Sequence, residues 1–170
     1  KAVVQQALGG VLFIDEAYSL VSGDRDSFGK EALDTLMKEM EDHREDLVVI
    51  AAGYTSEMRK LFAANPGLKS RFPTTLHFDD YDAAQLMKIA ERLLEPHKMR
   101  LAEDASVLLK NHFDAVLASR DPSARGNNGR GVRNLLDAAK RAQAMRLAQI
   151  KTAKSVQDLI TLTAEDCEAA

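Results

Sequence analysis

The chain has 170 residues, of which 45% are hydrophobic, and this is enough for one globular unit or two small subdomains with a buried core. Its 23 basic and 26 acidic residues give a net charge of -3, so bulk charge provides no reason to expect nucleic acid or an anionic membrane as a partner. Cys167 is the only cysteine, which excludes an intrachain disulfide and favours a reducing, intracellular compartment, and the four histidines lack zinc-ligand spacing.

The first ten residues, KAVVQQALGG, resemble the end of a helix that begins upstream. They are too short and too polar for a signal peptide. The longest apolar run in the chain is far shorter than the roughly 20 residues that a membrane span needs. We therefore expect no membrane partner.

Two continuous apolar runs, VLFIDE (residues 11–16) and LVVIAAGY (residues 47–54), are typical of strands that are covered on both faces of a parallel sheet. Between them, residues 27–43 place apolar side chains at helical spacing. This order of strand, helix and strand predicts a βαβ unit and the α/β fold class. TTLHF (residues 74–78) is a weaker third strand candidate.

After about residue 82 the pattern predicts helices only. Asp82 and Gln85 have the spacing of a capping box, which begins a helix that Pro96 interrupts. Further helices are expected around residues 108–116, around residues 132–139 and, after a cap formed by Thr163 and Asp166, at the C-terminus.

These patterns predict two subdomains. Residues 1–81 form the parallel-sheet α/β portion and residues 82–170 form an all-helical portion, with the boundary close to residues 78–82. The segment SRDPSARGNNG (residues 119–129) is rich in turn-forming residues, which favours an exposed loop.

Two adjacent carboxylates, Asp15 and Glu16, follow the first apolar run directly. In an open α/β sheet, ligands collect at the carboxyl ends of the strands. Asp15 can hold Mg²⁺ there, because this ion often takes one or two protein carboxylates beside substrate phosphates. Glu16 can activate a water for attack on a phosphoryl group. The other interpretation is that the pair only ends a strand and begins a turn.

Three segments together resemble AAA+ ATPases of the CbbX/CfxQ branch. GGVLFIDEAYSL (residues 9–20) is similar to a Walker B segment, and NPGLKSRF (residues 65–72) and GNNGRGVRNLLDAAKRAQAMRL (residues 126–147) are similar to later parts of this branch. The branch includes red-type rubisco activases and relatives in sporulation and type VII secretion. The resemblance covers nearly the whole chain and implies the C-terminal part of an AAA+ module, from Walker B to the helical lid.

The resemblance implies roles for five positions. Asp15 is the acid associated with Mg²⁺, and Glu16 polarises the attacking water. Arg71 matches the arginine finger that reaches the nucleotide of a neighbouring subunit, and its planar charged group suits phosphate oxygens. Arg130 matches the sensor-2 arginine of the lid, with Arg133 as the competing candidate. The alternatives are a surface residue or a carboxylate partner for Arg71 and a solvated helix face for the other two arginines.

Two further positions depend on the same resemblance. Tyr54, or Thr55, lies where many AAA+ proteins have a sensor-1 asparagine, so Tyr54 either contacts the nucleotide site or packs its ring under the lid. The segment VSGDRDS (residues 21–27) matches a second pore loop of a hexamer. A solvated polar loop is the equally weighted alternative.

The chain contains no phosphate-binding loop of the form G-x-x-x-x-G-K-[ST]. The pair Gly29-Lys30 is followed by Glu31, has the wrong spacing from Gly23 and lies in the predicted helix. The resemblance places the phosphate-binding loop before Lys1. We therefore expect this fragment to bind ATP poorly and not to hydrolyse it alone.

The function implied by the resemblance is part of an ATP- and Mg²⁺-dependent motor, a homo-oligomeric ring that remodels a protein substrate. Rubisco is the leading candidate for that substrate. The alternative is a non-catalytic interaction or scaffold module that keeps the fold without the chemistry. The expected compartment is the cytoplasm, or the plastid stroma if the protein is algal.

Overall fold

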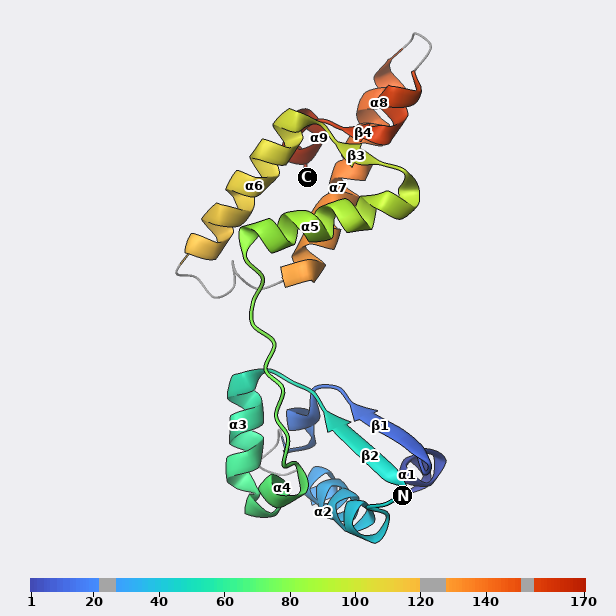
Figure 1. Ribbon diagram of the computed structural model, residues 1–170, viewed down its shortest axis with the longest axis vertical. Helices are drawn as coiled ribbons and strands as arrows, with labels where there is room; N and C mark the ends of the chain where they lie inside the picture. Colours follow the sequence, from blue (N-terminus) through green and yellow to red (C-terminus); the bar gives the residue numbers. More distant parts are fainter. Residues whose placement is uncertain (22–26, 120–127, 151–154) are drawn as a thin grey trace. The chain divides into compact units, whose positions relative to one another are not determined.

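A computed structural model describes residues 1–21, 27–119, 128–150 and 155–170 (Figure 1). The backbone forms two compact units, Lys1–His77 and Phe78–Ala170. Each unit has hydrophobic clusters of its own. The mixed α/β class predicted from the sequence is confirmed.

The first unit is a two-stranded parallel sheet with helices. β1 and β2 are aligned from Gly10 opposite Leu47 to Ile14 opposite Ala51, and α2 connects them, which confirms the predicted βαβ order. Both strands end earlier than predicted, before Asp15 and before Ala52. In chain order the elements are α1 (Ala2–Gln6), β1 (Gly10–Ile14), the 3-10 helix η1 (Ala17–Val21), α2 (Ser27–Asp42), β2 (Leu47–Ala51), α3 (Thr55–Ala64) and α4 (Pro66–Arg71).

Leucine side chains hold this unit together. Leu33 and Leu36 of α2 are three residues apart, so they share one face of the helix, and both are buried. Leu33 packs with Leu61 of α3 and Leu68 of α4, whereas Leu36 packs with Leu47 at the start of β2. Burying such a side chain contributes on the order of 2 kcal/mol. These contacts fix the strands and thereby the turns that follow them.

The face of the sheet opposite the helices is more exposed than predicted. Val11, Phe13, Val48 and Ile50 are 56%, 60%, 56% and 46% exposed, because they alternate with the residues that face the helices. The prediction that both strands are covered on both faces is therefore wrong for the residues that the structure describes. Continuous apolar sequence does not by itself distinguish a covered face from an uncovered one.

The third strand candidate is also wrong. Residues 73–82 have no regular secondary structure, and Leu76 and Phe78 are 76% and 87% exposed. Neither sheet in the described part of the chain includes residues 74–78. A β-forming sequence becomes a strand only where a neighbouring strand provides backbone hydrogen bonds and a surface to pack on.

The second unit is a helical domain built on α5, α6 and α7. Its core contains Leu94, Leu109, Val132 and Leu136, each about 1% exposed. The parallel pair of β3 and β4 was not predicted, since two residues per strand carry no periodicity. The elements are α5 (Ala83–Leu94), η2 (Glu95–His97), β3 (Arg100–Leu101), α6 (Glu103–Ala118), α7 (Asn128–Gln149), α8 (Val156–Ile160), β4 (Thr161–Leu162) and α9 (Ala164–Glu168).

Side-chain hydrogen bonds define the helix ends of this unit. Both predicted capping boxes are confirmed, at Asp82 with Gln85 and at Thr163 with Asp166. A third, between Ser155 and Asp158, begins α8. Each box satisfies backbone donors that a helix N-terminus leaves unpaired.

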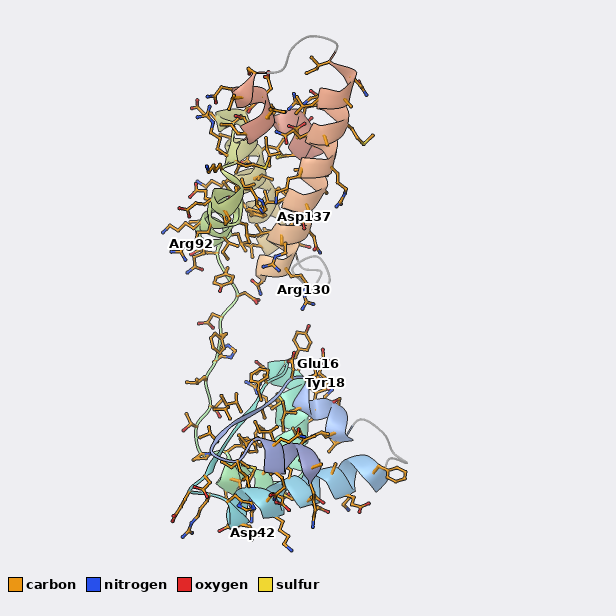
Figure 2. All side chains as sticks on the ribbon, turned by 90° about the vertical axis from the view of Figure 1, so that its right-hand side faces the viewer. Glu16, Tyr18, Asp42, Arg92, Arg130 and Asp137 are labelled. Carbon is orange, nitrogen blue, oxygen red and sulfur yellow. The ribbon has the colours of Figure 1, made fainter. Side chains whose placement is uncertain are left out.

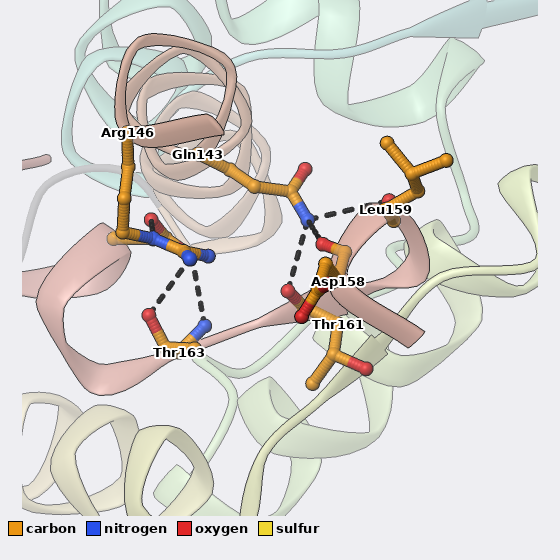
Figure 3. A network of polar contacts seen from close by, with 7 residues as sticks. Gln143, Arg146, Asp158, Leu159, Thr161 and Thr163 are labelled. Atoms are coloured by element: carbon orange, nitrogen blue, oxygen red, sulfur yellow. Dashed lines mark hydrogen bonds and ion pairs between the residues drawn. The ribbon is translucent and has the colours of Figure 1, made fainter. Parts of the chain in front are cut away.

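A buried polar network fastens α7 to the C-terminal segment (Figure 3). Arg146 donates from Nε and Nη2 to the two carboxylate oxygens of Asp166, at 2.7 and 2.8 Å. Gln143 is 6% exposed, and its side-chain amide group donates to three backbone carbonyls, those of Asp158, Leu159 and Thr161. Buried polar groups that are paired in this way specify one arrangement of the neighbouring elements.

Candidate functional site

The candidate site lies where β1 and β2 end. Because the strands are parallel, their carboxyl ends share one edge of the sheet. The backbone N–H of Ala52 donates to the carbonyl of Ile14 at 2.8 Å, and that of Ala17 donates to the carbonyl of Ala52 at 3.0 Å. These two bonds tie together the turns that carry Asp15, Glu16 and Tyr54.

Asp15 follows the last residue of β1 and is exposed. Its Oδ1 accepts a hydrogen bond from the backbone N–H of Glu16 at 2.9 Å, which orients the carboxylate. Oxygen donors at such an edge suit Mg²⁺, which usually binds one or two carboxylates and completes its shell with water and phosphate. Within the described ranges, no three His, Cys, Asp or Glu side chains form a group that could hold a metal ion.

Glu16 has a backbone φ of 48°, in the left-handed region. For a residue with a side chain this conformation costs roughly 1–2 kcal/mol. The Glu16 carbonyl accepts from the N–H of Ser19 at 2.8 Å, which begins η1 directly after the turn. The sharp turn leaves the Glu16 side chain exposed at the sheet edge. No glycine lies at residues 15–17, so no signal in the sequence predicts a left-handed turn there.

Two tyrosines lie beside this turn. The Tyr18 and Tyr54 ring centroids are 6.3 Å apart with an interplanar angle of 37°. Tyr54 precedes α3 as its N-cap residue and is 67% exposed. Partial burial raises the pKa of the Tyr18 phenol, and the charge of Glu16 and a side-chain hydrogen bond with it raise this pKa further. Tyr18 was not among the residues that the sequence predicted, because an aromatic residue near two acids carries no specific signal.

Arg71 is held by its own unit. Its Nε donates to the carbonyl of Met37 at 3.2 Å and its Nη1 to the carbonyl of Gly67 at 3.2 Å. Its Nη2 lies 3.5 Å from the carboxylate of Glu41, and the Arg71 side chain is 31% exposed. Figure 1 shows α4 beside α2. Among the described residues, these contacts of Arg71 are with α2 and α4 and not with Asp15 or Glu16.

Arg130 and Arg133 belong to the second unit. They are the third and sixth residues of α7, and both are exposed. Figure 2 labels Arg130. Asn128, the first residue of this helix, has φ of 40°. Its side chain donates to Asp80 Oδ1 at 2.6 Å and accepts from the N–H of Tyr81 at 3.1 Å. The start of α7 is thus tied to the segment that leads into α5.

Two other sequence predictions concern the segment around the start of α2. Residues 22–26, the centre of the predicted pore loop, lie outside the described residues. Gly29 and Lys30 lie in α2, which agrees with the rejection of this pair as a phosphate-binding loop. None of the described helices is both long enough and apolar enough to cross a bilayer.

Comparison with known protein families defines the class. Residues 1–80 match the model of the ATPase family associated with various cellular activities (AAA). Residues 82–170 match the model of the AAA lid domain. The two models divide the chain between a domain with the parallel strands and a helical domain.

Individual relatives define the branch. Stage V sporulation protein K of Bacillus subtilis (strain 168) is 44% identical over 167 residues, which cover 98% of this chain and 51% of that protein. Protein CfxQ homolog of Trieres chinensis is 41% identical over 171 residues, covering 98% and 56%. Protein CbbX of Cereibacter sphaeroides is 37% identical over 171 residues, covering 99% and 54%. The chain belongs to the AAA+ ATPases of the CbbX/CfxQ branch, and it spans about half the length of these relatives.

Proposed function

We propose that this chain supplies the Walker B, sensor and lid portions of a motor that couples ATP hydrolysis to the remodelling of a protein. One observation carries the proposal. Asp15 and Glu16 follow β1 at the carboxyl edge of a parallel sheet, and the loop after β2 is hydrogen-bonded to the same turn. In an open α/β sheet this edge is where phosphate ligands and their metal ion bind.

The two carboxylates have different tasks in the proposed reaction. Asp15, oriented by its bond from the Glu16 N–H, would hold Mg²⁺ directly or through water. When bound, this ion neutralises charge on the phosphate oxygens. Glu16 would accept a proton from the attacking water as the water oxygen bonds to the γ-phosphorus, while the bond from that phosphorus to the β–γ bridging oxygen breaks and ADP leaves. We assign the sensor-1 position to Tyr54, or to Thr55, which lie after β2 at the start of α3.

The arginines are proposed to act on the same nucleotide from other elements. Arg71 acts across a subunit boundary, and among the described residues its own-chain contacts are with α2 and α4 and not with Asp15 or Glu16. The backbone carbonyls of Met37 and Gly67 hold its guanidinium in a defined place. Arg130, or alternatively Arg133, contributes a positive charge from the lid to the nucleotide phosphates. Both residues are exposed near the start of α7.

The assembly and substrate follow from the same branch. We propose a homo-oligomeric ring and a protein substrate, with rubisco as the leading candidate because two of the relatives are named CbbX and CfxQ. The proposed compartment is the cytoplasm, or the plastid stroma for an algal protein. A reducing compartment suits the single cysteine, Cys167, which is buried as a free thiol.

A scaffold without catalysis is the second candidate, and one observation favours it. The 170 residues contain no G-x-x-x-x-G-K-[ST] segment, which an active site of this class needs for the β- and γ-phosphates. The two candidates differ in what the complete protein does with Mg²⁺-ATP. A motor binds and hydrolyses it, whereas a scaffold does not.

The test is Glu16→Gln in the complete protein. The amide keeps the size of the side chain but loses the charge that polarises water, so we expect ATP affinity within about threefold of the unmodified protein and turnover reduced at least about 100-fold. Glu45→Gln is the matched control, since Glu45 is exposed in the turn between α2 and β2. Retained turnover in Glu16→Gln would contradict the proposal, and turnover lost equally in both variants would also contradict it.

A further inference from the structure

The first residue of α7 is tied to the chain segment that enters α5. Asn128 donates from its side-chain Nδ2 to Oδ1 of Asp80 at 2.6 Å, and its Oδ1 accepts from the backbone N–H of Tyr81 at 3.1 Å. Asp80 and Tyr81 directly precede Asp82, the N-cap residue of α5. One side chain therefore joins two segments of the second unit that are 47 and 48 residues apart in the sequence.

The backbone of Asn128 has a conformation that most side chains avoid. Its φ of 40° lies in the left-handed region, where asparagine is one of the few residues other than glycine that occur regularly. Glycine would adopt this conformation more easily, but it has no side chain for either hydrogen bond. Asparagine meets both requirements, because it tolerates the turn and its amide group offers a donor and an acceptor at once.

Apolar packing continues the contact between the two helices. Val132 of α7 is 1% exposed and belongs to the same buried cluster as Ala83, the first residue of α5. A Cβ atom at Gly129 would lie 3.9 Å from Cδ1 of Ile89, so α7 lies close to α5 from its second residue onward. Figure 1 shows the starts of α5 and α7 at the same end of the second unit. The hydrogen bonds of Asn128 extend this contact to the segment before α5.

The start of α7 also carries the two candidates for the lid arginine. Arg130 and Arg133 are exposed and lie two and five residues after Asn128. A guanidinium pairs with phosphate oxygens only over a narrow range of distance and direction, and a displacement of about 1 Å can cost on the order of 100-fold in rate. Bonds that hold the first residue of α7 therefore also hold the backbone from which these arginines project.

We propose that Asn128 is a positioning residue for the lid arginine, because it locks the start of α7 to Asp80 and Tyr81. The inference rests on the proposed role of Arg130, or of Arg133, at the nucleotide. It makes residues 80 and 81 part of the rigid body of the lid, although they precede its first helix.

The first test exchanges the two partners in the complete protein. In Asn128→Asp, two carboxylates face each other where a donor met an acceptor, so we expect kcat for ATP hydrolysis to fall about tenfold. Asp80→Asn alone should stay within about twofold, since its amide oxygen still accepts. The double variant with Asn128→Asp and Asp80→Asn restores a donor opposite an acceptor, so kcat should recover to within about threefold of the unmodified protein.

Asn134→Asp is the matched control for the swap. Asn134 is exposed on the same helix α7, and the change in charge is the same as at Asn128. We expect its kcat to stay within about twofold of the unmodified protein, because a surface substitution away from the tied segments leaves the start of α7 in place.

The second test observes the hydrogen bond directly. Amide hydrogen exchange of the 170-residue chain, measured by NMR, reports on the Tyr81 N–H that donates to Asn128. Asn128→Gly keeps the left-handed backbone accessible and removes the side chain, so this amide should exchange at least about fivefold faster. The N–H of Cys167, which donates to the carbonyl of Thr163, should keep its rate in Asn128→Gly and in Asn128→Asp, because the lid stays folded.

The outcomes separate this inference from the proposed function. With an inactive Glu16→Gln, an unchanged Tyr81 amide in Asn128→Gly would overturn the inference alone, and so would a double variant no more active than Asn128→Asp. Faster exchange at Cys167 in parallel with the loss of kcat would also overturn it, since that pattern is structural.

Two further outcomes concern the rest of the site. Full turnover in both Arg130→Ala and Arg133→Ala would overturn the inference, because no lid arginine would be left to position. An active Glu16→Gln would remove the proposed function itself, and with it this inference.

Discussion

The ion pair between Arg146 and Asp166 offers a sharp test of the forces that hold the second unit together. The Asp166 side chain is 1% exposed and accepts four hydrogen bonds. Two come from Arg146, at 2.7 and 2.8 Å, and two come from the N–H and hydroxyl of Thr163, at 2.9 and 3.0 Å. Replacing Asp166 by Ala removes all four at once.

The expected cost follows from the exposure of the partner. Breaking a fully buried pair costs about 3–5 kcal/mol, because the remaining charge is left without compensation. The Arg146 side chain is 23% exposed and can recover some water, which places the expected loss near the lower limit, at about 3 kcal/mol. The loss includes the capping contribution of about 1 kcal/mol at α9.

The pH dependence provides a second signature. Burial opposes ionisation of Asp166, but the hydrogen bonds from Arg146 and Thr163 outweigh it and lower the pKa of this carboxyl. The folded-state pKa is therefore below the unfolded value of about 3.9. The stabilisation is fully present above the unfolded pKa and is lost as the pH falls through the folded pKa. The difference between native protein and variant should be constant from pH 6 to 7 and shrink below about pH 4.

Urea denaturation of the chain, followed by circular dichroism at several pH values, measures both effects. Asp137→Ala is the matched control. Asp137 also forms an ion pair, with Lys140 of the same helix α7 at 3.5 Å, but its side chain is 51% exposed. Its loss is expected to be below about 1 kcal/mol. A loss of less than about 1 kcal/mol for Asp166→Ala at pH 7, or a loss that does not change with pH, would refute the reasoning.

Two further predictions concern Arg71 and Cys167. Arg71→Ala is expected to stop ATP hydrolysis only in the assembled ring. In mixed rings, an Arg71→Ala subunit keeps Glu16 and a Glu16→Gln neighbour keeps Arg71, so mixing the two variants should restore activity. No restoration in rings shown to be mixed would contradict action between subunits. Burial, with smaller effects of Asp166 and Asp104, raises the pKa of the Cys167 thiol to about 11. Iodoacetamide at pH 8 should therefore label the native chain at least roughly 100-fold more slowly than the unfolded chain, and a ratio below tenfold would contradict this burial.

Local patterns in the sequence predicted the parts of the fold that depend on neighbouring residues. The capping boxes at Asp82 and Thr163 were predictable because both partners lie within one helical turn. The order of β1, α2 and β2 was predictable because its apolar patterns are long. The prediction of a strand at residues 74–78 was wrong, since strand formation there depends on a pairing partner and not on local composition.

The same distinction between local and long-range features applies to the candidate site. Asp15 and Glu16 could be named as candidates because they directly follow an apolar run in the sequence. The contact of Tyr18 with Gly53 and the bond from Arg71 to the carbonyl of Met37 could not be found, since each joins residues more than thirty positions apart. The left-handed turn at Glu16 was also not predictable, because glutamate rarely adopts it and only the surrounding backbone bonds hold it there.

The central claim is that the edge after β1 and β2 binds the phosphates and metal ion of ATP. A crystal structure of the complete protein with Mg²⁺ and a non-hydrolysable ATP analogue tests it most directly. We expect an Asp15 oxygen about 2.1 Å from Mg²⁺, or about 4 Å with one water between, and the Glu16 carboxylate within about 3 Å of a water facing the γ-phosphate. Nucleotide bound with its γ-phosphate more than about 10 Å from both acids would contradict the account.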